Sequence, residues 1–382
     1  MSEYQYYEFQ AIDRPLTEKE IRELRSYSTR ARITPTSFVN DYSWGNFKGD
    51  EDAWMEKYFD AFLYLANWGT HVLKLRLPSR LLDLKTTLLY CSGEQAFARE
   101  KGGKVILTFV SEDEEGGSWV EGEGSLSSLI SVRAELMRGD LRCLYLGWLP
   151  CVQSGELDDE DVEPPVPAGL GQLSATLESL VEFLRIDPHL LHMAARTSQP
   201  MEDSRPEKEE IHKWVRKLPG NEKDDILAKL IAGEDLAPAT DLLQRFIKER
   251  DAGGPRTAEQ TKRRTVGELL STTEEHVEQQ RRLAAQKAAE EKARHEREAA
   301  ISRAKHLDEI AGREPKLWNE VENLIATKQP KSYDHAVKLL IDLRDLAVRR
   351  GKREEFGARL GALRAAQARK PSFIERLRKA GL

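Results

Sequence analysis

LAAQKAAEEKARHEREAAISRAKHL, residues 283–307, is the stretch that decides the architecture of the C-terminal half of this chain. Its Ala, Glu, Lys and Arg residues are good helix formers, and Glu–Lys and Glu–Arg pairs recur at helical spacing. Residues 258–310 contain no proline and a single glycine, Gly267. One long helix is therefore predicted over residues 257–311. Because most of its apolar positions are Ala, and coiled coils need larger residues at positions a and d, it is expected to span between modules or to pair weakly as a coiled coil.

The C-terminal side of this helix, residues 313–382, reads as a compact helical bundle. Apolar residues recur at helical spacing in separate stripes, and Pro330, Gly351 and Pro371 divide them. The stripes are Leu317, Val321, Leu324 and Ile325; then Val337, Leu340, Ile341, Leu343 and Leu346; then Phe356, Leu360 and Leu363; and finally Phe373, Ile374 and Leu377.

On the N-terminal side, residues 170–250 are predicted to form short helices, over 173–184, 209–218, 222–231 and 242–247. Residues 154–169 combine six acidic residues with three prolines. Such a composition buries too little apolar surface to fold by itself. We therefore expect an acidic, Pro-rich, flexible linker at 154–169.

Residues 1–153 read as a mixed α/β head. Strands are predicted over residues 4–12, 33–42 (broken at Pro35), 72–77, 104–110, 119–121 and 141–148, and helices over 18–27, 50–66 and 125–137. Thr17–Glu20 has the spacing of a capping box, and Asp50 suits the start of the second helix. The predicted fold class is α+β, with antiparallel-type sheet pairing in the head and an all-α tail.

Bulk properties point to a cytoplasmic protein. The 382 residues carry a net charge of −6, with 40% hydrophobic and 32% charged residues. No apolar run approaches the roughly 18 residues that cross a bilayer, and the N-terminal residues lack a signal-peptide pattern. The three cysteines form neither a disulfide framework nor a zinc set. We therefore expect no membrane association and no cofactor.

Four strings in the chain resemble a family of uncharacterised bacterial cytoplasmic proteins. They are ITPTSFVNDYSWGNFKGD (33–50), YFDAFLYLANWGTHVLKLRLP (58–78), KWVRKLPGNEKDDILAKLIAGE (213–234) and the ending from Tyr333 to Leu382. The helical C-terminal part is similar to that of bacterial SWIM zinc-finger proteins. The Cys-x-Cys pair of the SWIM metal site is absent from this chain. The resemblance implies no active site, and it suggests a SWIM zinc-finger-type protein as a partner of the helical tail.

No catalytic motif is present. The chain lacks a Gly-x-Ser-x-Gly elbow, His-Glu-x-x-His and a phosphate-binding Gly-Lys-Ser/Thr loop. Cys91 has no His or Asn partner in its sequence context, so a buried thiol is expected rather than a nucleophile. These absences favour a protein that is not an enzyme.

Two short motifs have both a structural and a functional interpretation. Asp187, His189 and His192 place two imidazoles at i, i+3, but a metal site needs a third ligand. Asp187 as a helix cap, followed by Pro188, explains the same string. The turn Gly122–Ser125 precedes a helix and could bind an anion, yet Glu121 and Glu123 would repel phosphate. The structural interpretation is favoured for both.

Aromatic residues concentrate in the head. Trp54 and Trp68 are assigned to its core, whereas Trp44 and Phe47 lie in DYSWGNFKGD, where Gly, Asn and Asp indicate a loop. Loop aromatics beside polar groups often form a binding surface, although this loop could instead fold back and cap the core. The candidate recognition loop comprises Asp41, Trp44, Phe47 and Lys48.

The C-terminal bundle is rich in Arg and Lys. The candidate basic patch comprises Arg349, Arg350, Lys352, Arg353, Arg364, Arg369, Lys370 and Arg376. Such residues could form a solvated helix face, meet an acidic protein or bind nucleic acid. No base-reading motif accompanies them.

Together these features favour a non-enzymatic protein-interaction or scaffold protein. The head would carry the recognition surface, and the tail would serve as spacer and partner-binding bundle. Two alternatives stay open at this point: a nucleic-acid-associated factor that uses the basic bundle, and an enzyme of unknown type with a site in the head.

Overall fold

The computed structural model describes residues 3–113, 122–201, 208–232, 241–243, 245–247, 249 and 263–382. The chain divides into two compact units, Met1–Glu278 and Gln279–Leu382. The long helix α12, Val266–Ile310, begins in the first unit and ends in the second. The predicted α+β class is confirmed, with a sheet in the first unit and helices throughout the second.

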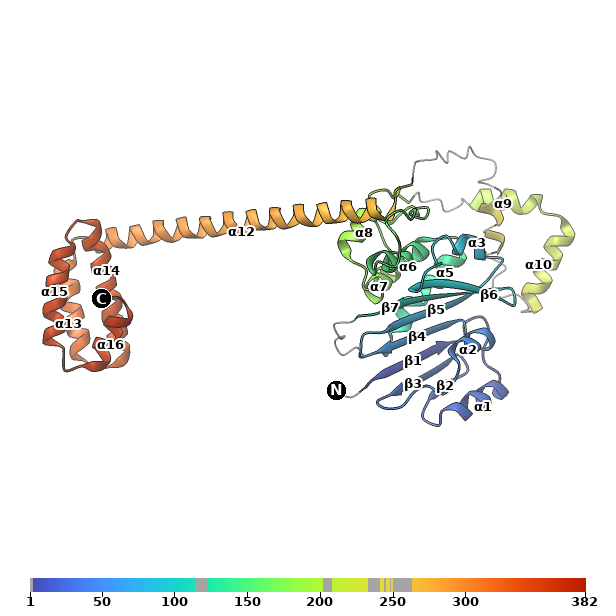
Figure 1. The fold of residues 1–382 in the computed structure, drawn as a ribbon, viewed down its shortest axis with the longest axis horizontal. Helices are drawn as coiled ribbons and strands as arrows, with labels where there is room; N and C mark the ends of the chain where they lie inside the picture. The colour runs from blue at the N-terminus through green and yellow to red at the C-terminus, as the bar shows by residue number, and fades with distance from the viewer. Residues whose placement is uncertain are drawn as a thin grey trace. The chain divides into compact units, whose positions relative to one another are not determined.

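An antiparallel sheet of seven strands organises the first unit, in the order β2-β3-β1-β4-β5-β7-β6 (Figure 1). The strands are β1 Gln5–Gln10, β2 Arg32–Thr34, β3 Ser37–Tyr42, β4 Ala61–Ala66, β5 His71–Pro78, β6 Ala96–Lys101 and β7 Lys104–Ser111. The predicted break at Pro35 separates β2 from β3, which pair as a hairpin. Because β1 pairs with both β3 and β4, the N-terminal strand lies inside the sheet.

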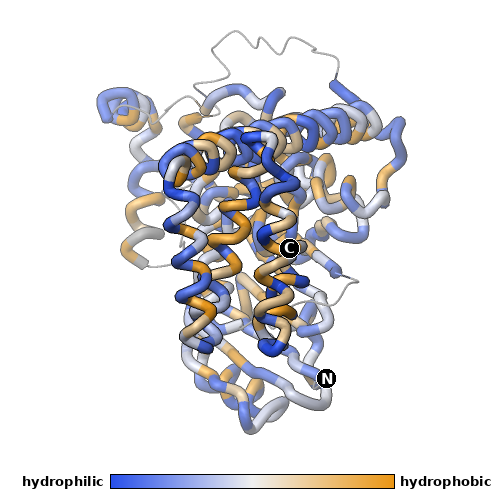
Figure 2. The backbone as a smooth tube through the Cα atoms, turned by 90° about the vertical axis from the view of Figure 1, so that its left-hand side faces the viewer, coloured by the Kyte–Doolittle hydropathy of each residue, from blue (hydrophilic) through white to orange (hydrophobic). Residues whose placement is uncertain are grey.

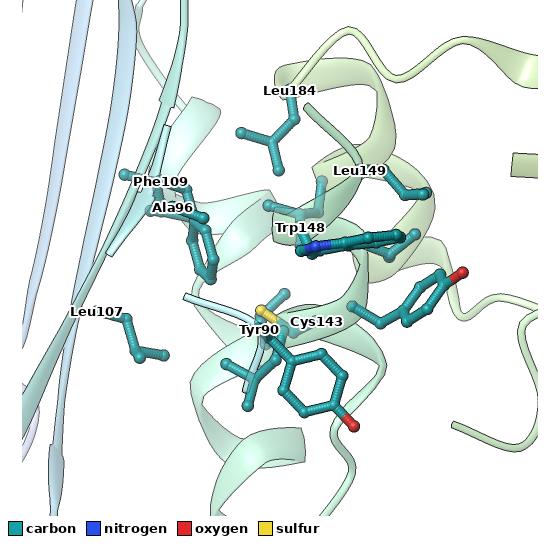
Figure 3. Packing of buried hydrophobic residues seen from close by; sticks show 14 of the residues in the cluster. Tyr90, Ala96, Leu107, Phe109, Cys143, Trp148, Leu149 and Leu184 are labelled. Atoms are coloured by element: carbon teal, nitrogen blue, oxygen red, sulfur yellow. The ribbon is translucent and has the colours of Figure 1, made fainter. Parts of the chain in front are cut away.

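Each face of the sheet buries its own apolar core. The helices α1 (Glu18–Tyr27) and α2 (Glu51–Lys57) pack on the face that carries Tyr7, Phe9 and Phe38. The opposite face packs against a second helical layer that includes the start of α12. That layer comprises α3 Leu84–Thr87, α4 Ser125–Leu129, α5 Ser131–Met137, α6 Arg142–Gln153, α7 Ala175–Phe183 and α8 Pro188–Ala195. Figure 3 shows side chains of β6, β7 and α6 meeting in this second core.

Two predicted elements of the head are wrong. The helix predicted over residues 50–66 stops at Lys57, and residues 61–66 form the central strand β4. The strand predicted over residues 141–148 is the helix α6, in which every residue except Gln153 is buried. A fully buried strand and a fully buried helix both appear as short apolar runs, so hydrophobic periodicity alone does not distinguish them.

The hairpin in this region also differs from the prediction. Residues 104–111 do form a strand, but β7 pairs with β6 across Gly102 and Gly103. Both glycines have positive φ, 59° and 72°, as a tight two-residue hairpin turn requires. The strand predicted at 119–121 lies outside the described residues.

The acidic segment 154–169 differs from the expected flexible linker. Glu163 is buried, and its carboxylate accepts two hydrogen bonds from Arg264, at 2.6 and 2.7 Å, and one from the Tyr145 hydroxyl. Val266 N–H donates to the carbonyl of Asp161. The segment is therefore ordered by contacts with α6 and the start of α12, which composition does not reveal. Since α7 and α8 share the second core, they belong to the first unit rather than to a separate helical segment.

The remaining helices of the first unit begin near their predicted positions. They are α9, Lys208–Lys217, and α10, Gly220–Ala232, joined at Leu218 and Pro219. Residues 241–243 and 245–247 are also helical. Among the described helices, none combines the length and the apolar character needed to cross a membrane.

The C-terminal unit confirms the predicted stripes. After α12 come α13 Glu314–Ala326, α14 Pro330–Arg349, α15 Arg353–Ala366 and α16 Pro371–Lys379. Trp318, Val321, Leu340, Phe373 and Leu377 are among the buried residues of its core. Figure 2 shows apolar residues recurring between polar ones along these helices. Burial of this face, more than helix propensity, stabilises such short helices.

Candidate recognition surface of the sheet domain

Of the candidate recognition loop, Asp41 lies on β3, whereas Trp44, Phe47 and Lys48 lie in residues 43–49, which connect β3 to α2. The two aromatic residues of this connection face different environments. Phe47 is half-buried, stacks on Tyr7 with ring centroids 5.0 Å apart, and meets Trp54 edge-on at 4.8 Å. Trp44 is 71% exposed. The sequence left open whether this loop caps the core or forms a surface. The structure shows both, because Phe47 caps the core and Trp44 lies on the surface.

A buried amide on β1 holds this loop in place. Gln5 Nε2 donates to the carbonyl of Gly45, at 3.1 Å, and to Asn46 Oδ1, at 3.3 Å. Its Oε1 accepts from the hydroxyls of Tyr7 and Tyr64, at 2.8 and 3.2 Å. Burial raises the pKa of Tyr64 to about 12 and also raises that of Tyr7, so both phenols keep their protons. The Gln5 amide is thus fully hydrogen-bonded, and it fixes the backbone next to Trp44.

The guanidinium of Arg30 lies close to the Trp44 ring. Its guanidinium carbon lies 5.3 Å from the Trp44 ring centroid, a cation–π distance. Within the described part of the chain, Arg30 forms no ion pair or hydrogen bond. An exposed indole beside an unpaired guanidinium combines two of the three residue types enriched in the energetic centres of protein interfaces, which are Trp, Tyr and Arg.

A cleft of about 270 Å³ lies over the β2–β3–β1 part of the sheet. It is lined by Tyr4, Tyr6, Arg30, Arg32, Val39, Asn40, Asp41 and Glu123. Strand register brings some of these residues together, since Arg32 pairs with Val39, and Asp41 pairs with Tyr6. Asp41 is exposed at this cleft. Because Arg32 forms an ion pair with Glu123, at 3.1 Å, one of its two arginines is already neutralised.

Gly122 brings the chain onto this part of the sheet. A Cβ atom at this position would lie 2.2 Å from Cγ of Tyr6, so only glycine fits against the ring. The turn continues through Gly124, whose φ of 88° is left-handed, into α4. Glu123 is committed to Arg32, and α4 spans only five residues. The turn therefore fits the structural interpretation, a connection that leads into α4, better than an anion-binding site.

A second cleft, of about 260 Å³, lies under the other end of the loop. It is lined by Tyr7, Asn46, Phe47, Gly49, Asp50, Glu51, Asp52 and Lys74. Lys74 is buried and lies 2.7 Å from Asp52 and 3.3 Å from Glu51. Burial raises the pKa of Glu51, and Lys74 partly opposes that shift. Lys74 thus pairs with two of the three carboxylates that line this cleft.

The four predicted loop residues do not form a single site. Asp41 lines the first cleft, Phe47 lines the second, and Trp44 and Lys48 are exposed on the loop. Arg30 and Arg32 were not among the residues predicted from the sequence. Alternation along β2 and β3 was the signal that could have placed Arg32 on the same face as Val39 and Asp41.

The candidate basic patch of the C-terminal unit is mostly engaged internally. Arg353 and Arg369 form no ion pair or hydrogen bond with other described residues. The other six have partners within the unit: Arg349 with Asp308, Arg350 with Glu314, Lys352 with Glu355, Arg376 with Asp334, Arg364 with the Leu382 carbonyl and Lys370 with the Ile325 carbonyl. These contacts lie within the bundle, and Arg349, Arg350, Lys352 and Arg364 remain exposed to solvent.

The remaining candidates have structural roles. Cys91 is fully buried, and burial raises the pKa of its thiol well above the usual range, which keeps it protonated and unreactive. Trp54 is buried as predicted, but Trp68 is exposed in the β4–β5 turn. Asp187 caps α8 by accepting from His189 N–H and Leu190 N–H. Over the described ranges, no group of three His, Cys, Asp or Glu side chains is arranged to hold a metal.

Comparison with known proteins adds no relative, since no family model, no curated protein and no solved structure matches this chain.

Proposed function

We propose that this chain is a non-enzymatic protein-interaction or scaffold protein of the cytoplasm. Its recognition surface would comprise Trp44, Arg30 and the neighbouring cleft on β2, β3 and β1. The observation that carries the proposal is the exposed Trp44 ring on a backbone that Gln5 and Phe47 hold from below. A rigid aromatic side chain contributes contact area at little entropic cost, which suits an interface anchor.

The charge distribution supports an interaction surface more than a catalytic site. Both clefts are slightly smaller than the roughly 300–1,000 Å³ of typical small-molecule pockets. Their carboxylates are mostly paired with Lys74 or Arg32. Cys91, the remaining nucleophile considered, is buried. An enzyme with its site in the head is therefore the weaker proposal.

The C-terminal bundle would provide a second contact. The resemblance of this part to SWIM zinc-finger proteins suggests a protein of that type as its partner. Arg353 and Arg369, which lack partners among the described residues, would be the cationic contacts available to an acidic surface on it. Binding at this bundle does not require the Trp44 surface, so the two contacts are separable by substitution.

Affinity capture with matched tryptophan variants tests the head proposal. The full-length protein, Trp44→Ala and Trp68→Ala would each be crosslinked in cells and their partners quantified by mass spectrometry. Trp68 is the control because it is also exposed, at 45%, and belongs to the β4–β5 turn instead of the loop. We expect Trp44→Ala to reduce recovery of a specific partner by about tenfold or more, as loss of an interface anchor does. Equal recovery with the two variants would contradict the proposal.

A further inference from the structure

Three histidines from two helices of the first unit meet at one contact. His189 and His192 lie on α8, and His276 lies on α12. The His192 and His276 rings stack, with centroids 4.8 Å apart and an interplanar angle of 23°. The His189 and His276 centroids are 5.6 Å apart. The third histidine that the α8 pair lacked in sequence thus comes from more than eighty residues away, and within the described part of the chain no such group is arranged to hold a metal.

The charged groups around this contact favour neutral rings. The pKa of His276 is lowered, by desolvation first and then by His192, His189 and Arg196. At helical spacing from His276, α12 presents only Thr272, Thr273, Gln279 and Gln280, which carry no charge. On α8, the carboxylate of Asp187 is occupied as the helix cap, and Arg196 adds positive charge. The exposed Glu274 and Glu275 of α12 do not figure among the charges that act on His276.

The contact lies where α12 leaves the first unit. The first turn of α12 is held firmly by Val266 and Leu269, both fully buried, and by the Arg264–Glu163 ion pair that precedes it. His276 follows two turns later, and the first unit ends at Glu278. From residue 278 to residue 302 the helix is exposed on all sides. The three imidazoles are therefore the last side-chain cluster on α12 before the exposed stretch.

We propose that His189, His192 and His276 form a proton-sensitive contact that holds the third turn of α12 on α8 when neutral and releases it when protonated. Like charges at this separation repel, and the charges that act on His276 among the described residues, those of His192, His189 and Arg196, all disfavour its protonated form. The first turn would stay attached through Val266, Leu269 and Arg264. Acidification would thus shorten the docked part of α12 without unfolding the unit. This inference does not depend on the proposed function.

Histidine NMR on the full-length protein tests the coupling directly. We expect the imidazole of His276 to titrate below the ordinary imidazole pKa of about 6.5. Substituting His192→Asn should raise the pKa of His276, because it removes one of the neighbouring charges that lower it. If His192→Asn leaves the pKa of His276 unchanged, the proposal is overturned.

Hydrogen exchange tests the release. Between about pH 7.5 and about pH 5.5, on either side of the ordinary imidazole pKa of about 6.5, amides of residues 272–278 should exchange at least about threefold faster after correction for intrinsic rates. His276→Gln should remove this pH dependence, and His295→Gln should leave it unchanged. His192→Asn supplies the same test if His276→Gln fails to fold. The measurement is made in EDTA and repeated with added Zn²⁺ alone. Protection that requires Zn²⁺ would identify a metal site and overturn the proton-sensitive interpretation.

Discussion

The buried residue His71 connects several elements of the first unit through hydrogen bonds. It lies on β5, where its Nδ1 is 2.9 Å from the carbonyl of Phe183 and its Nε2 is 2.8 Å from Nη2 of Arg185. A guanidinium only donates, so Nε2 accepts and Nδ1 carries the proton. Arg185 also donates to the carbonyl of Gly69, and it adopts a left-handed backbone with φ of 53°. The arrangement therefore requires a neutral imidazole.

This requirement predicts that acid destabilises the first unit through His71. Burial, together with the nearby Arg185 charge, lowers the pKa of His71, although the Phe183 carbonyl partly opposes the shift. The unfolded chain therefore takes up a proton near pH 6.5, whereas the folded protein takes it up only at lower pH. The resulting stabilisation is complete above about pH 6.5 and decreases as the pH falls below it. Urea unfolding at about pH 7.5 and about pH 5.5 measures the effect.

A matched pair of variants isolates the contribution of His71. His71→Gln keeps one donor and one acceptor but does not titrate, so its free energy of unfolding should depend less on pH than that of the natural protein. His212→Gln, on the exposed surface of α9, should retain the full dependence. Identical pH dependence in His71→Gln and the natural protein would contradict the assignment.

At the scale of elements, the contact of α6 with the sheet depends on one glycine. A Cβ atom at Gly147 would lie 2.1 Å from Cε1 of Phe109, a ring of β7 that is fully buried. The close approach of α6 to Phe109 therefore needs glycine at this position. Glycine also costs helix stability, about 1 kcal/mol relative to alanine, so the packing gain must exceed that cost.

Gly147→Ala should lower the free energy of unfolding by roughly 1–3 kcal/mol, because overpacking a well-packed core outweighs the gain in helix propensity. Adding Phe109→Leu to Gly147→Ala should recover part of the loss, which a double-mutant cycle measures. Gly357→Ala is the control, since it lies in α15 with no atom within 4 Å of the added Cβ. That control should be neutral or stabilising. Stabilisation by Gly147→Ala would show that the packing is looser than inferred.

At the scale of the whole molecule, the internal pairing of the basic patch argues against strong nucleic-acid binding. Nucleic acids bind through cations that exchange counterions for phosphates, so binding weakens steeply with salt. Four of the eight patch residues form ion pairs within the C-terminal unit, two more donate to backbone carbonyls, and the chain carries a net charge of −6. The full-length protein should therefore give no gel shift with duplex DNA or RNA at about 50 mM salt, low enough to favour phosphate contacts.

Arg353→Glu together with Arg369→Glu provides the matched variant for this experiment. A gel shift that weakens steeply with salt and that this double variant removes would support the nucleic-acid alternative instead. A shift that the double variant leaves unchanged would point to a surface outside the C-terminal patch.

The sequence alone determined the helical tail, the strand break at Pro35, the caps at Thr17, Asp50 and Asp187, and the α+β class. These features depend on contacts within a few residues, which periodicity and capping chemistry report directly. Only the tertiary structure decided that residues 61–66 are a strand and residues 142–153 a helix, because full burial erases the amphipathic pattern. Only the tertiary structure also decided that Trp44 is exposed while Phe47 packs on the core, and that His276 contacts α8. Those outcomes depend on side chains brought together from distant parts of the chain, and local sequence does not encode their distance in space.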